Sequence, residues 1–463
     1  MPVSADVRVD VAVVGAGIAG IATAFYLCTR HQVASVLLID SRQAMSFTSA
    51  QSGDNYRNWW PHATMVDFTN DSIDLMEGLA RESSNIFRMT RRGYALATRR
   101  ETIDDLVAEL HEGYATGDDS EIRIRANGAN DSYQAPDSEA WEEAPDGVDV
   151  LSNQSLIRSV FPSFDTGIEH VVHIRRAGDI SGQQLGQYML ERYRDAGGQK
   201  TIGNLRGLER GQHYVLDIET SDGTQIVRAD RVVDAAGPFA GKIAAMIDQS
   251  LPLENIFQQK IAFEDTLAAV PRNQPFSIDL DQKRLSWTDE ERQLLAEDSD
   301  LAWLTELLPS GTHCRPDGGD HGKWVKLGWA YNSAISLPQD DLANEPRLDA
   351  QFPEIVIRGA AGFIPSLAAY IENPPTRFSH YGGYYTMTEE NWPLIGPLGD
   401  DGAFVVGALS GFGSMAACAA GSLCASWVCG GELPAYAADL SVSRYENSKL
   451  INVLCSSVNK GLL

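Results

Sequence analysis

Short apolar runs and a glycine-rich turn alternate at the start of the chain. Residues 9–14 are mostly β-branched, residues 21–27 are apolar, and residues 34–39 form a second apolar run that ends at Asp40. Short, continuously apolar runs of β-branched residues are typical of parallel strands that are buried on both faces. The pattern predicts a strand, a helix and a second strand in this order.

The turn between the first strand and the helix has the sequence Gly15-Ala16-Gly17-Ile18-Ala19-Gly20. In this spacing the first glycine permits a tight turn, the second lets the backbone approach a pyrophosphate, and the third lets the helix lie close to the strand. The N–H groups of the helix N-terminus suit phosphates. Asp40 follows at the distance where an acidic residue accepts hydrogen bonds from a ribose. The unit therefore predicts a dinucleotide-binding site.

The chain after Asp40 does not continue as alternating strands and helices. A polar segment, residues 48–54, comes first, and a helix is predicted over residues 69–83. The remaining strands of the nucleotide-binding sheet are therefore expected from distant segments. Residues 231–236 and 404–409 have the apolar character of such strands, and each run ends in a turn that contains glycine.

Composition places the chain among globular proteins and excludes two classes of partner. Hydrophobic residues make up 43% and charged residues 22% of the 463 residues, a balance typical of folded domains. Lys and Arg total 37 against 63 Asp and Glu, a formal net charge of −26. Because this charge repels phosphate backbones and anionic lipid, neither nucleic acid nor a membrane surface is expected as a partner.

The chain shows no targeting signal and no metal-binding motif. Residues 1–10 lack the basic stretch and apolar run of a secretory signal, and the most apolar segment, residues 414–428, is too short for a membrane span. A cytoplasmic protein is expected. The six cysteines lack zinc or disulfide spacing and are expected as buried thiols. His170 with His173, and His313 with His321, are expected as solvated loop histidines, not metal ligands.

Three motifs in this order carry a family resemblance. They are the glycine fingerprint, the turn Ala-Ala-Gly-Pro-Phe-Ala at residues 235–240, and the run Gly-Gly-Tyr-Tyr-Thr-Met-Thr-Glu-Glu-Asn-Trp-Pro-Leu-Ile-Gly-Pro at residues 382–397. Together they resemble the FAD-dependent D-amino acid oxidase (DAO) superfamily, closest to its sarcosine oxidase and glycine oxidase branch. The resemblance implies an α/β fold, in which a Rossmann-like FAD-binding domain (GR2-type) is interleaved with a mixed-sheet substrate domain.

The resemblance also implies how the chain divides. The FAD-binding domain is expected from residues 1–95, 164–250 and 381–463, and the substrate domain from residues 96–163 and 251–380, with a helical insertion at 279–322. The helical stretch 288–308 is predicted either to cover the active site or to form a subunit contact, which leaves a homo-oligomer open. The acidic segment 118–149 is expected as a surface loop with little regular structure.

By the same resemblance, FAD is bound in an extended form by residues from four parts of the chain. The implied residues are Gly15, Ala16, Gly17, Ile18, Ala19, Gly20, Asp40, Ser41 and Arg42; Ser49, Ala50, Gln51, Ser52 and Gly53; Leu205, Ala236 and Gly237; and Gly411, Phe412, Gly413, Ser414 and Met415. In sarcosine oxidases a cysteine bonded to the flavin stands two residues before a substrate-contacting tyrosine. The matching pair here is Gly383 and Tyr385, so non-covalent FAD is expected.

The last of these turns also has a reading from its own residues. Gly411 and Gly413 let the backbone approach a flat ring, and Ser414 is predicted to cap the helix that follows. The N-terminus of that helix would stabilise negative charge on a reduced flavin. The alternative is a glycine-rich loop before a helix that is buried for packing alone.

Lys326 is the leading catalytic candidate. Residues 324–329 alternate like a strand and resemble the family's Lys-Leu-Gly segment, whose lysine lies near the flavin through a water and promotes reaction with O₂. A fixed cation has a physical reason there, because the first electron transferred to O₂ makes an anion. The alternative is a surface lysine on an edge strand.

Two further residues are candidates for contact with flavin or substrate. Arg57 resembles an arginine near the flavin, which either polarises the ring or binds substrate. The segment 58–62 after it is rich in aromatic residues and forms either a pocket wall or a buried structural pair of tryptophans, and His62 is expected as a satisfied polar residue. Tyr385 is predicted to contact substrate, with an ordinary strand tyrosine as the alternative.

The family's substrate-carboxylate anchors are only partly matched. Met415 stands where sarcosine oxidases have a lysine, and Ala330 where they have a histidine. A different or larger substrate is implied, with its acid group held by Arg57 or by Arg91 and Arg92.

The resemblance implies an amine or amino-acid oxidase of class EC 1.4 or 1.5. Hydride from the carbon next to an amine nitrogen reduces the flavin, the imine hydrolyses, and O₂ reoxidises the flavin to give hydrogen peroxide. A small amine or amino acid and O₂ are the expected partners. Two alternatives stay open: a dehydrogenase of an amino or 2-hydroxy acid that passes electrons to a quinone or carrier protein, and a non-catalytic FAD subunit.

Overall fold

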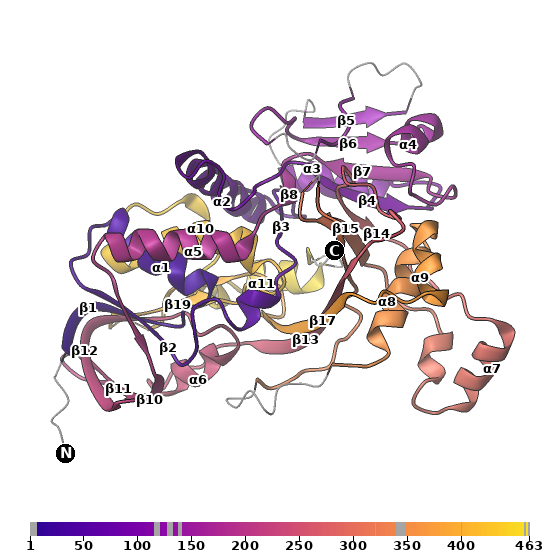
Figure 1. Ribbon diagram of the computed structural model, residues 1–463. Helices are drawn as coiled ribbons and strands as arrows, with labels where there is room; N and C mark the ends of the chain where they lie inside the picture. Colours follow the sequence, from indigo (N-terminus) through magenta and orange to yellow (C-terminus); the bar gives the residue numbers. More distant parts are fainter. Residues whose placement is uncertain are drawn as a thin grey trace.

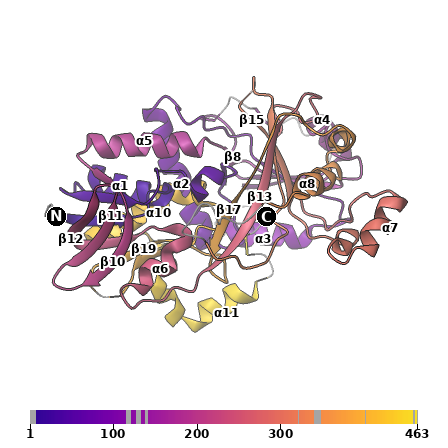
Figure 2. The same cartoon turned by 60° about the horizontal axis from the view of Figure 1, so that its bottom comes forward.

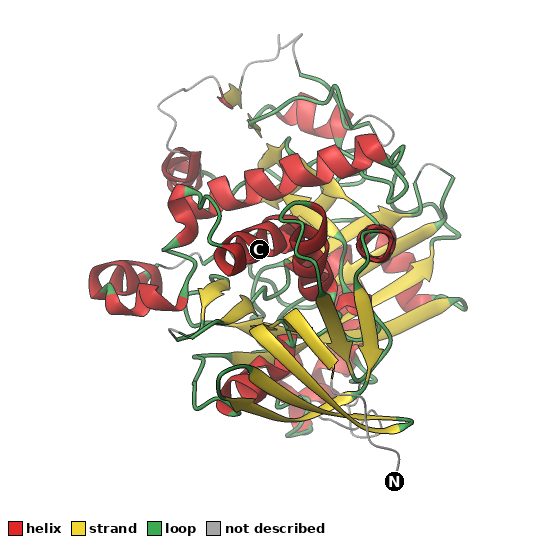
Figure 3. Cartoon of the chain, turned by 90° about the vertical axis from the view of Figure 1, so that its left-hand side faces the viewer, coloured by secondary structure: helices red, strands yellow, loops and turns green. Residues whose placement is uncertain are grey.

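Two large β-sheets lie next to each other, and the chain passes from one to the other several times (Figure 1). The computed structural model describes residues 7–114, 121–126, 133–137, 141–319, 321–338, 348–399, 401–457 and 460–461. Figure 3 shows the strands of both sheets, with helices packed against them. The fold is therefore mixed α/β, as predicted.

The first sheet has eight strands, of which five run parallel in the order β9-β2-β1-β12-β19. The hairpin β10-β11 joins β12 in antiparallel register, and β18 pairs with β19. The bounds are β1 Val7–Val14, β2 Val36–Asp40, β9 Gln199–Ile202, β10 Asn204–Arg210, β11 Tyr214–Thr220, β12 Gly223–Asp234, β18 Leu394–Pro397 and β19 Ala403–Gly407. The prediction that distant segments complete this sheet is confirmed.

Helix α1 (Ile18–Thr29) packs against the first sheet and against α10 (Gly413–Cys429). Nearly every residue of both helices is buried, as expected for helices that are apolar on all sides. Small residues in α10 let the two backbones approach, since a Cβ atom on Gly421 would stand 2.5 Å from the carbonyl carbon of Ala22. This packing holds the helix that follows the glycine turn.

The second sheet has nine strands in the order β17-β13-β16-β15-β14-β4-β7-β6-β5. The pairs β14-β4 and β5-β6 are parallel and the others antiparallel, so the sheet is mixed. The bounds are β4 Tyr94–Thr98, β5 Ile122–Arg125, β6 Val148–Leu151, β7 His170–Ile174, β13 Glu254–Glu264, β14 Phe276–Asp279, β15 Thr312–Asp317, β16 Trp324–Gly328 and β17 Phe378–Met387.

Two of these strands bear on the expected division of the chain. Strand β4 crosses the boundary expected at residue 95, and β7 pairs in the second sheet although residues 164–250 are expected in the FAD-binding domain. A short apolar run such as β7 indicates a strand but not the sheet to which it pairs. The division of the chain into domains stays a prediction.

The two faces of the nine-stranded sheet have different neighbours. One face carries Tyr94 and Leu96, which share a hydrophobic core with α1 and α10. The opposite face carries Phe263 and Leu327, which pack with helix α8 (Phe352–Ala361) in a separate core. The first face is therefore turned toward the eight-stranded sheet.

The remaining elements connect and cover the two sheets. The strands β3 (Asn55–Arg57) and β8 (Ala177–Asp179) form a small antiparallel sheet between them. The other helices are α2 Ala63–Glu82, α3 Asp104–Tyr114, α4 Gln154–Val160, α5 Gly182–Asp195, α6 Ala240–Ala245, α7 Asp289–Glu297, α9 Ala369–Glu372 and α11 Ser448–Ser456. Within the described residues no helix has the length and apolar character needed to cross a membrane.

The helical insertion differs from its prediction. The stretch 288–308 forms α7 and a separate 3₁₀ turn, Ala302–Thr305, because Asp298 takes an extended conformation after α7. Figures 1 and 2 both place α7 on the side of the molecule away from the eight-stranded sheet.

Three polar residues expected on the surface lie in strands instead, and two of them are buried. Asp149, in the segment expected as an acidic surface loop, lies in β6 and accepts hydrogen bonds from Arg123, Arg125 and Arg175. Of the two histidines expected in solvated loops, His173 is buried in β7 and His313 is half-buried in β15. The spacing of residues along the sequence could not predict these positions, because the neighbours come from other parts of the chain. Arginines from other segments surround Asp149, and aromatic rings pack against the two histidines.

Candidate active site

A cleft of about 610 Å³ opens at the carboxyl ends of β1, β2 and β12. In open α/β sheets this edge is where ligands bind, and the volume lies within the range of about 300–1,000 Å³ found for ligand pockets. The predicted cofactor-binding residues that line the cleft are Gly15, Ala16, Gly17, Ile18, Ala19, Asp40, Ser41, Arg42, Ser49, Leu205, Ala236, Gly237 and Gly413.

Two glycines of the fingerprint are required by close contacts. Gly15 has a φ of +112°, and a Cβ atom there would stand 2.2 Å from the carbonyl oxygen of Ala235. A Cβ atom on Gly20 would stand 1.9 Å from the carbonyl oxygen of Gly15. These contacts are those of a tight turn and of a helix packed directly on it.

The side chains of Asp40 and Ser49 brace the glycine turn. Asp40 accepts hydrogen bonds from the backbone N–H groups of Ala16 (2.6 Å) and Arg42 (2.8 Å). Burial raises the pKa of Asp40, and these N–H groups oppose that shift. Ser49 Oγ accepts from the N–H of Ile18 at 3.0 Å. The predicted contact of Asp40 with a ribose stays a prediction.

Three aromatic residues form one wall of the cleft, and one of them, Phe47, lies outside the motifs. The Phe47 ring stands 5.8 Å from the rings of both Phe239 and Tyr384, and the Arg42 guanidinium lies 3.9 Å from the Phe47 ring centre. Phe239 and Tyr384 belong to the motifs of the family resemblance. Phe239 and Tyr384 lie beside Phe47 because the fold brings together three segments that are far apart in the chain.

The other predicted cofactor-binding residues do not line this cleft. They are Gly20, Ala50, Gln51, Ser52, Gly53, Gly411, Phe412, Ser414 and Met415. The prediction that Ser414 caps α10 is wrong, because the helix begins one residue earlier, at Gly413. Ser414 Oγ instead donates to Ser52 Oγ at 2.8 Å and lies 3.4 Å from Asp54.

The register of the nine-stranded sheet gathers polar side chains on one face. Tyr381 is aligned with Lys260, Lys260 with Gly328, and Gly328 with His313. Aligned residues, and residues two positions along each strand, share a face. The polar residues on this face are Gln258, Lys260, His313, Arg315, Asp317, Lys326, Tyr381 and Tyr385. It is the face turned toward the eight-stranded sheet.

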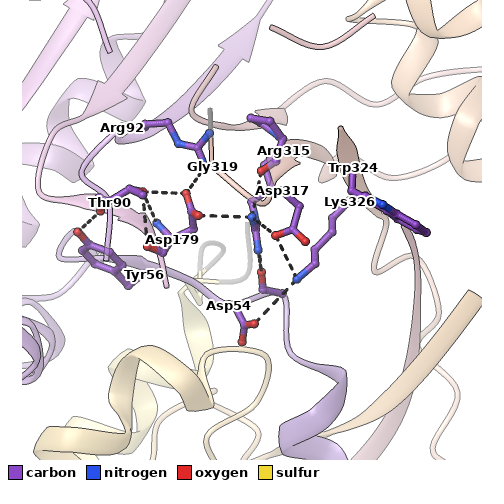
Figure 4. A network of polar contacts seen from close by, with 12 residues as sticks. Asp54, Tyr56, Thr90, Arg92, Asp179, Arg315, Asp317, Gly319, Trp324 and Lys326 are labelled. Atoms are coloured by element: carbon purple, nitrogen blue, oxygen red, sulfur yellow. Dashed lines mark hydrogen bonds and ion pairs between the residues drawn. The ribbon is translucent and has the colours of Figure 1, made fainter. Parts of the chain in front are cut away.

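Lys326 lies inside this sheet and carries two acidic neighbours. Strand β16 has β13 on one side and β15 on the other, which excludes the alternative of an edge strand. Lys326 Nζ stands 3.5 Å from Asp317 and 3.9 Å from Asp54 (Figure 4). Burial lowers the pKa of Lys326 and so does Arg315, whereas Asp317 and Asp54 raise it.

Arg315 extends this network to the loop that precedes β3. Its guanidinium donates to the carbonyl oxygen of Gly53 at 2.9 Å and to Asp317 at 2.8 Å, and it lies 3.5 Å from Asp179. Asp179 also accepts from Arg92. Each cation of this network therefore has a carboxylate beside it, and Arg315 ties the nine-stranded sheet to the predicted cofactor loop. No sequence motif indicated Arg315.

Arg57 is buried and has a different environment. Its Nε donates to the carbonyl oxygen of Trp59 at 3.0 Å and its Nη2 to that of Gly461 at 2.6 Å. Its guanidinium lies 4.8 Å from the Trp60 ring centre. Within the described residues no carboxylate stands within 4.0 Å of it, and burial lowers its pKa to about 10. Among the described residues, the charge of Arg57 is therefore uncompensated.

The aromatic segment after Arg57 supports the flavin turn predicted at residues 411–414. Trp59 and Trp60 are buried, and the Trp60 ring meets that of Phe412 at 4.9 Å. His62 Nδ1 accepts from the N–H of Thr64 and caps α2, as a satisfied polar residue does.

Arg91 and Arg92, the other candidate anchors, are engaged elsewhere. Arg91 donates to Asp146 and to the carbonyl oxygen of Pro145, and Arg92 is paired with Asp179. Since carboxylates of the protein already hold both guanidiniums, neither is free for a substrate acid.

No thiol of the described chain lines the cleft. Cys314 alternates with His313 and Arg315 along β15 and packs in the core on the opposite face of the sheet. Gly383 faces Gln51, with its Cβ position 3.0 Å from the Cβ of that residue. Within the described residues no group of three or more His, Cys, Asp or Glu side chains is placed to hold a metal ion.

The residues present fit a dinucleotide cofactor. The N-cap residues of α1 and α10, Gly17 and Phe412, make no side-chain hydrogen bond to their helices. A Cβ atom on Gly237, where φ is +57°, would meet nothing within 4 Å. Apart from the N–H of Ile18, which donates to Ser49 Oγ, these helix N-termini have no side-chain cap, and together with the open glycine turn they suit phosphate groups and the polar edge of a ring.

Comparisons with known proteins agree with this fit. The family model described as "FAD dependent oxidoreductase" (DAO) matches residues 10–427. Glycine oxidase from Geobacillus kaustophilus is similar in structure with a TM-score of 0.70 and 18% identity over 94% of this chain and 99% of that chain. L-proline dehydrogenase from P. horikoshii has a TM-score of 0.71 and 16% identity over 96% and 99%. Iminodiacetate oxidase from Chelativorans sp. BNC1 has a TM-score of 0.63 and 18% identity over 93% and 98%.

Proposed function

The chain belongs to the DAO family of FAD-dependent oxidoreductases, and we propose that it is an oxidase of the CH–NH bond of an amino acid or a secondary amine. FAD bound in the cleft would accept a hydride from the carbon next to the amine nitrogen, leave an imine that water hydrolyses, and return the electrons to O₂ as hydrogen peroxide. The absence of a thiol from the described cleft lining supports non-covalent binding of FAD.

One observation carries the proposal. Tyr385 and Lys326 share the sheet face that is turned toward the N-terminus of α10. A Cβ atom on Gly411 would stand 2.5 Å from the Tyr385 ring, and Lys326 reaches Asp54, which lies 3.4 Å from Ser414. A substrate between this face and the flavin turn would meet both side chains.

Each side chain has a task that follows from its chemistry. The Tyr385 hydroxyl orients the substrate by hydrogen bonding, since it is half-buried beside the turn. Lys326 stabilises the anion that forms when O₂ takes its first electron. The aromatic residues around the site would exclude water and hold the substrate amine against the flavin ring.

A second candidate has a specific observation in its favour. Asp54 and Asp317 stand beside Lys326 and offset the charge that would stabilise superoxide. A dehydrogenase that passes electrons to a quinone or carrier protein needs no such charge. One of the similar structures is a dehydrogenase, L-proline dehydrogenase.

The test is the substitution Lys326→Met in the FAD-loaded protein. We expect flavin content and anaerobic reduction by an amine substrate to stay nearly intact, and reoxidation in air to slow about 10-fold or more. Stopped-flow absorbance of the flavin measures each step separately, and Lys326→Arg, which keeps the charge, serves as the control.

Three results would contradict the oxidase proposal. If O₂ reoxidises the flavin at the same rate in the unchanged protein and in Lys326→Met, Lys326 has no role in the reaction with O₂. Slow reoxidation of the unchanged protein by O₂, together with fast reoxidation by a soluble quinone, selects the dehydrogenase. A yellow protein that no amine, amino acid or 2-hydroxy acid reduces would be a non-catalytic FAD subunit.

A further inference from the structure

Lys260 lies on strand β13 at the centre of the proposed site, although no motif marks it. Its Nζ donates to the Tyr385 hydroxyl at 3.2 Å and lies 5.0 Å from the centre of the Tyr385 ring. A Cβ atom on Gly53 would stand 3.8 Å from Lys260 Cε. The ammonium group therefore lies between the predicted cofactor loop at Gly53 and the flavin turn at Gly411, which Tyr385 touches. In Figure 2, β13 and β17, which carry these two residues, run side by side through the middle of the molecule.

Within the described residues the charge of Lys260 has no counter-ion. The residue is 8% exposed, and in the described part of the chain no carboxylate stands within 4.0 Å of its Nζ. Taking an ammonium group out of water without an anion beside it is costly. Lys326, on the next strand of the same face, shows the contrast, because Asp54 and Asp317 flank it.

The donor capacity of Lys260 is also incompletely used. An ammonium group has three donors, and the one acceptor found for it within the described residues is the Tyr385 hydroxyl. Since that hydroxyl accepts from Lys260, its own O–H is available to donate elsewhere. The pair thus presents ammonium and hydroxyl donors to one position, which matches the two oxygens of a carboxylate.

We propose that Lys260 binds the carboxylate of the substrate, with the Tyr385 hydroxyl as a second donor. The amine that this protein oxidises is then an amino acid rather than a neutral secondary amine. The inference rests on the proposed function, because it places the substrate on the sheet face that carries Tyr385. Met415, which stands where sarcosine oxidases have a lysine, is buried beside the backbone of Arg57 and supplies no cation.

The test measures binding of simple carboxylates to the FAD-loaded protein by perturbation of the flavin absorbance. The probes are acetate and benzoate, with acetamide and benzamide as neutral counterparts of the same shape. We expect Lys260→Met to weaken binding of both carboxylates about 10- to 100-fold, the effect of losing a charged hydrogen bond, and to leave binding of the amides unchanged.

Two further variants separate charge from structure. Lys260→Arg keeps the cation and should bind both carboxylates within about threefold of the unchanged protein. Lys260→Gln still donates to Tyr385 but has no charge, and we expect it to behave like Lys260→Met even if the methionine variant folds poorly. Lys326→Met removes an equal charge from the same face, but a compensated one, and should weaken carboxylate binding less than Lys260→Met does.

Equal carboxylate affinity in the unchanged protein and in both neutral variants would overturn the assignment. Loss of amide binding together with carboxylate binding would overturn it too, because the effect would then be structural. The proposed function fails independently: a protein that binds benzoate through Lys260 but is reduced by no amine contradicts the oxidase, whereas one that oxidises amines equally well without Lys260 contradicts only this inference.

Discussion

At the scale of single residues, Asp234 stands out because its buried carboxyl group has no cation beside it in the described part of the chain. It ends β12, and its Oδ1 accepts from the N–H of Ala236 at 3.1 Å, while its Oδ2 has no hydrogen-bond partner among the described residues. Burial raises the pKa of Asp234 from 3.8 to about 8, although the N–H of Ala236 lowers it in part. The carboxyl group is thus protonated at neutral pH, next to the turn at Ala236 and Gly237 that lines the cofactor cleft.

This predicts a pH-dependent gain in stability from Asp234→Asn. Below pH 4 both the folded and the unfolded states hold the proton, and the carboxyl costs no ionisation energy. Between pH 4 and 8 the carboxyl group loses its proton only in the unfolded state, so the stability of the folded protein falls as the pH rises. Above pH 8 both states have lost the proton, and the energetic cost of the buried carboxylate is constant. The gain in melting temperature of the asparagine variant should therefore grow from pH 5 to pH 9 in thermal unfolding monitored by circular dichroism.

A matched control is available for this experiment. Asp222 lies exposed in the turn between β11 and β12, and Asp222→Asn should change the melting temperature by the same small amount at every pH. A difference between the unchanged protein and Asp234→Asn that does not vary with pH would show that the buried carboxyl does not hold its proton.

The residues of the site differ in how far the sequence could predict them. Gly15, Gly20 and Asp40 stand in one local motif, so their spacing was enough to predict the turn that the structure shows. Lys260 and Arg315 lie in strands of ordinary composition, and their position depends on the register of neighbouring strands. Register is set by contacts between residues far apart in the chain, which a single sequence does not display.

At the scale of elements, the contact between α1 and α10 holds the turn on which the cleft is built. Gly421 lies where a Cβ atom would meet the backbone of Ala22 at 2.5 Å, whereas Gly78, in α2, has nothing within 4 Å of its Cβ position. The same substitution should therefore have opposite effects in the two helices.

We expect Gly421→Ala to destabilise the protein by about 1–3 kcal/mol, the usual cost of overpacking, and to weaken FAD retention. Gly78→Ala should stabilise it by about 0.5–1 kcal/mol through helix propensity alone. Chemical denaturation with flavin content as a second readout measures both effects. Equal stability of the two variants would mean that the helices can move apart without cost.

Elements were predicted well where the local signals agreed and poorly where they conflicted. The strands and helix around the glycine turn were predicted correctly, because apolar runs and turn residues coincide there. In the insertion, leucines continue at helical spacing past residue 297, but the carboxylate of Asp298 accepts from the N–H of Asp300 at 2.9 Å. Such a bond offers the backbone an alternative to the helix, and α7 ends there.

At the scale of the whole molecule, the two sheets share one hydrophobic core. Val11 and Val13 of the first sheet belong to the same buried cluster as Tyr94, Val172 and Ile278 of the second. Because the chain also passes between the sheets several times, neither sheet is expected to unfold by itself.

We therefore expect a single calorimetric transition that FAD shifts as a unit. With free FAD at 100 times its Kd, the folded state gains about 2.7 kcal/mol, and the entire transition should move to higher temperature. Differential scanning calorimetry with and without FAD makes this measurement. Two transitions, of which only one responds to FAD, would show that the sheets unfold independently.

The order in which the parallel strands join has a consequence for biosynthesis. Strand β1 is made first, but its neighbour β12 begins at residue 223, and β19 and α10 follow only after residue 402. A nascent chain on the ribosome therefore carries the α10-facing side of α1 uncovered until α10 has been made. Exposed apolar surfaces aggregate or recruit chaperones, so the yield of this protein in a cell should depend on chaperone supply during synthesis of the segment between β1 and α10.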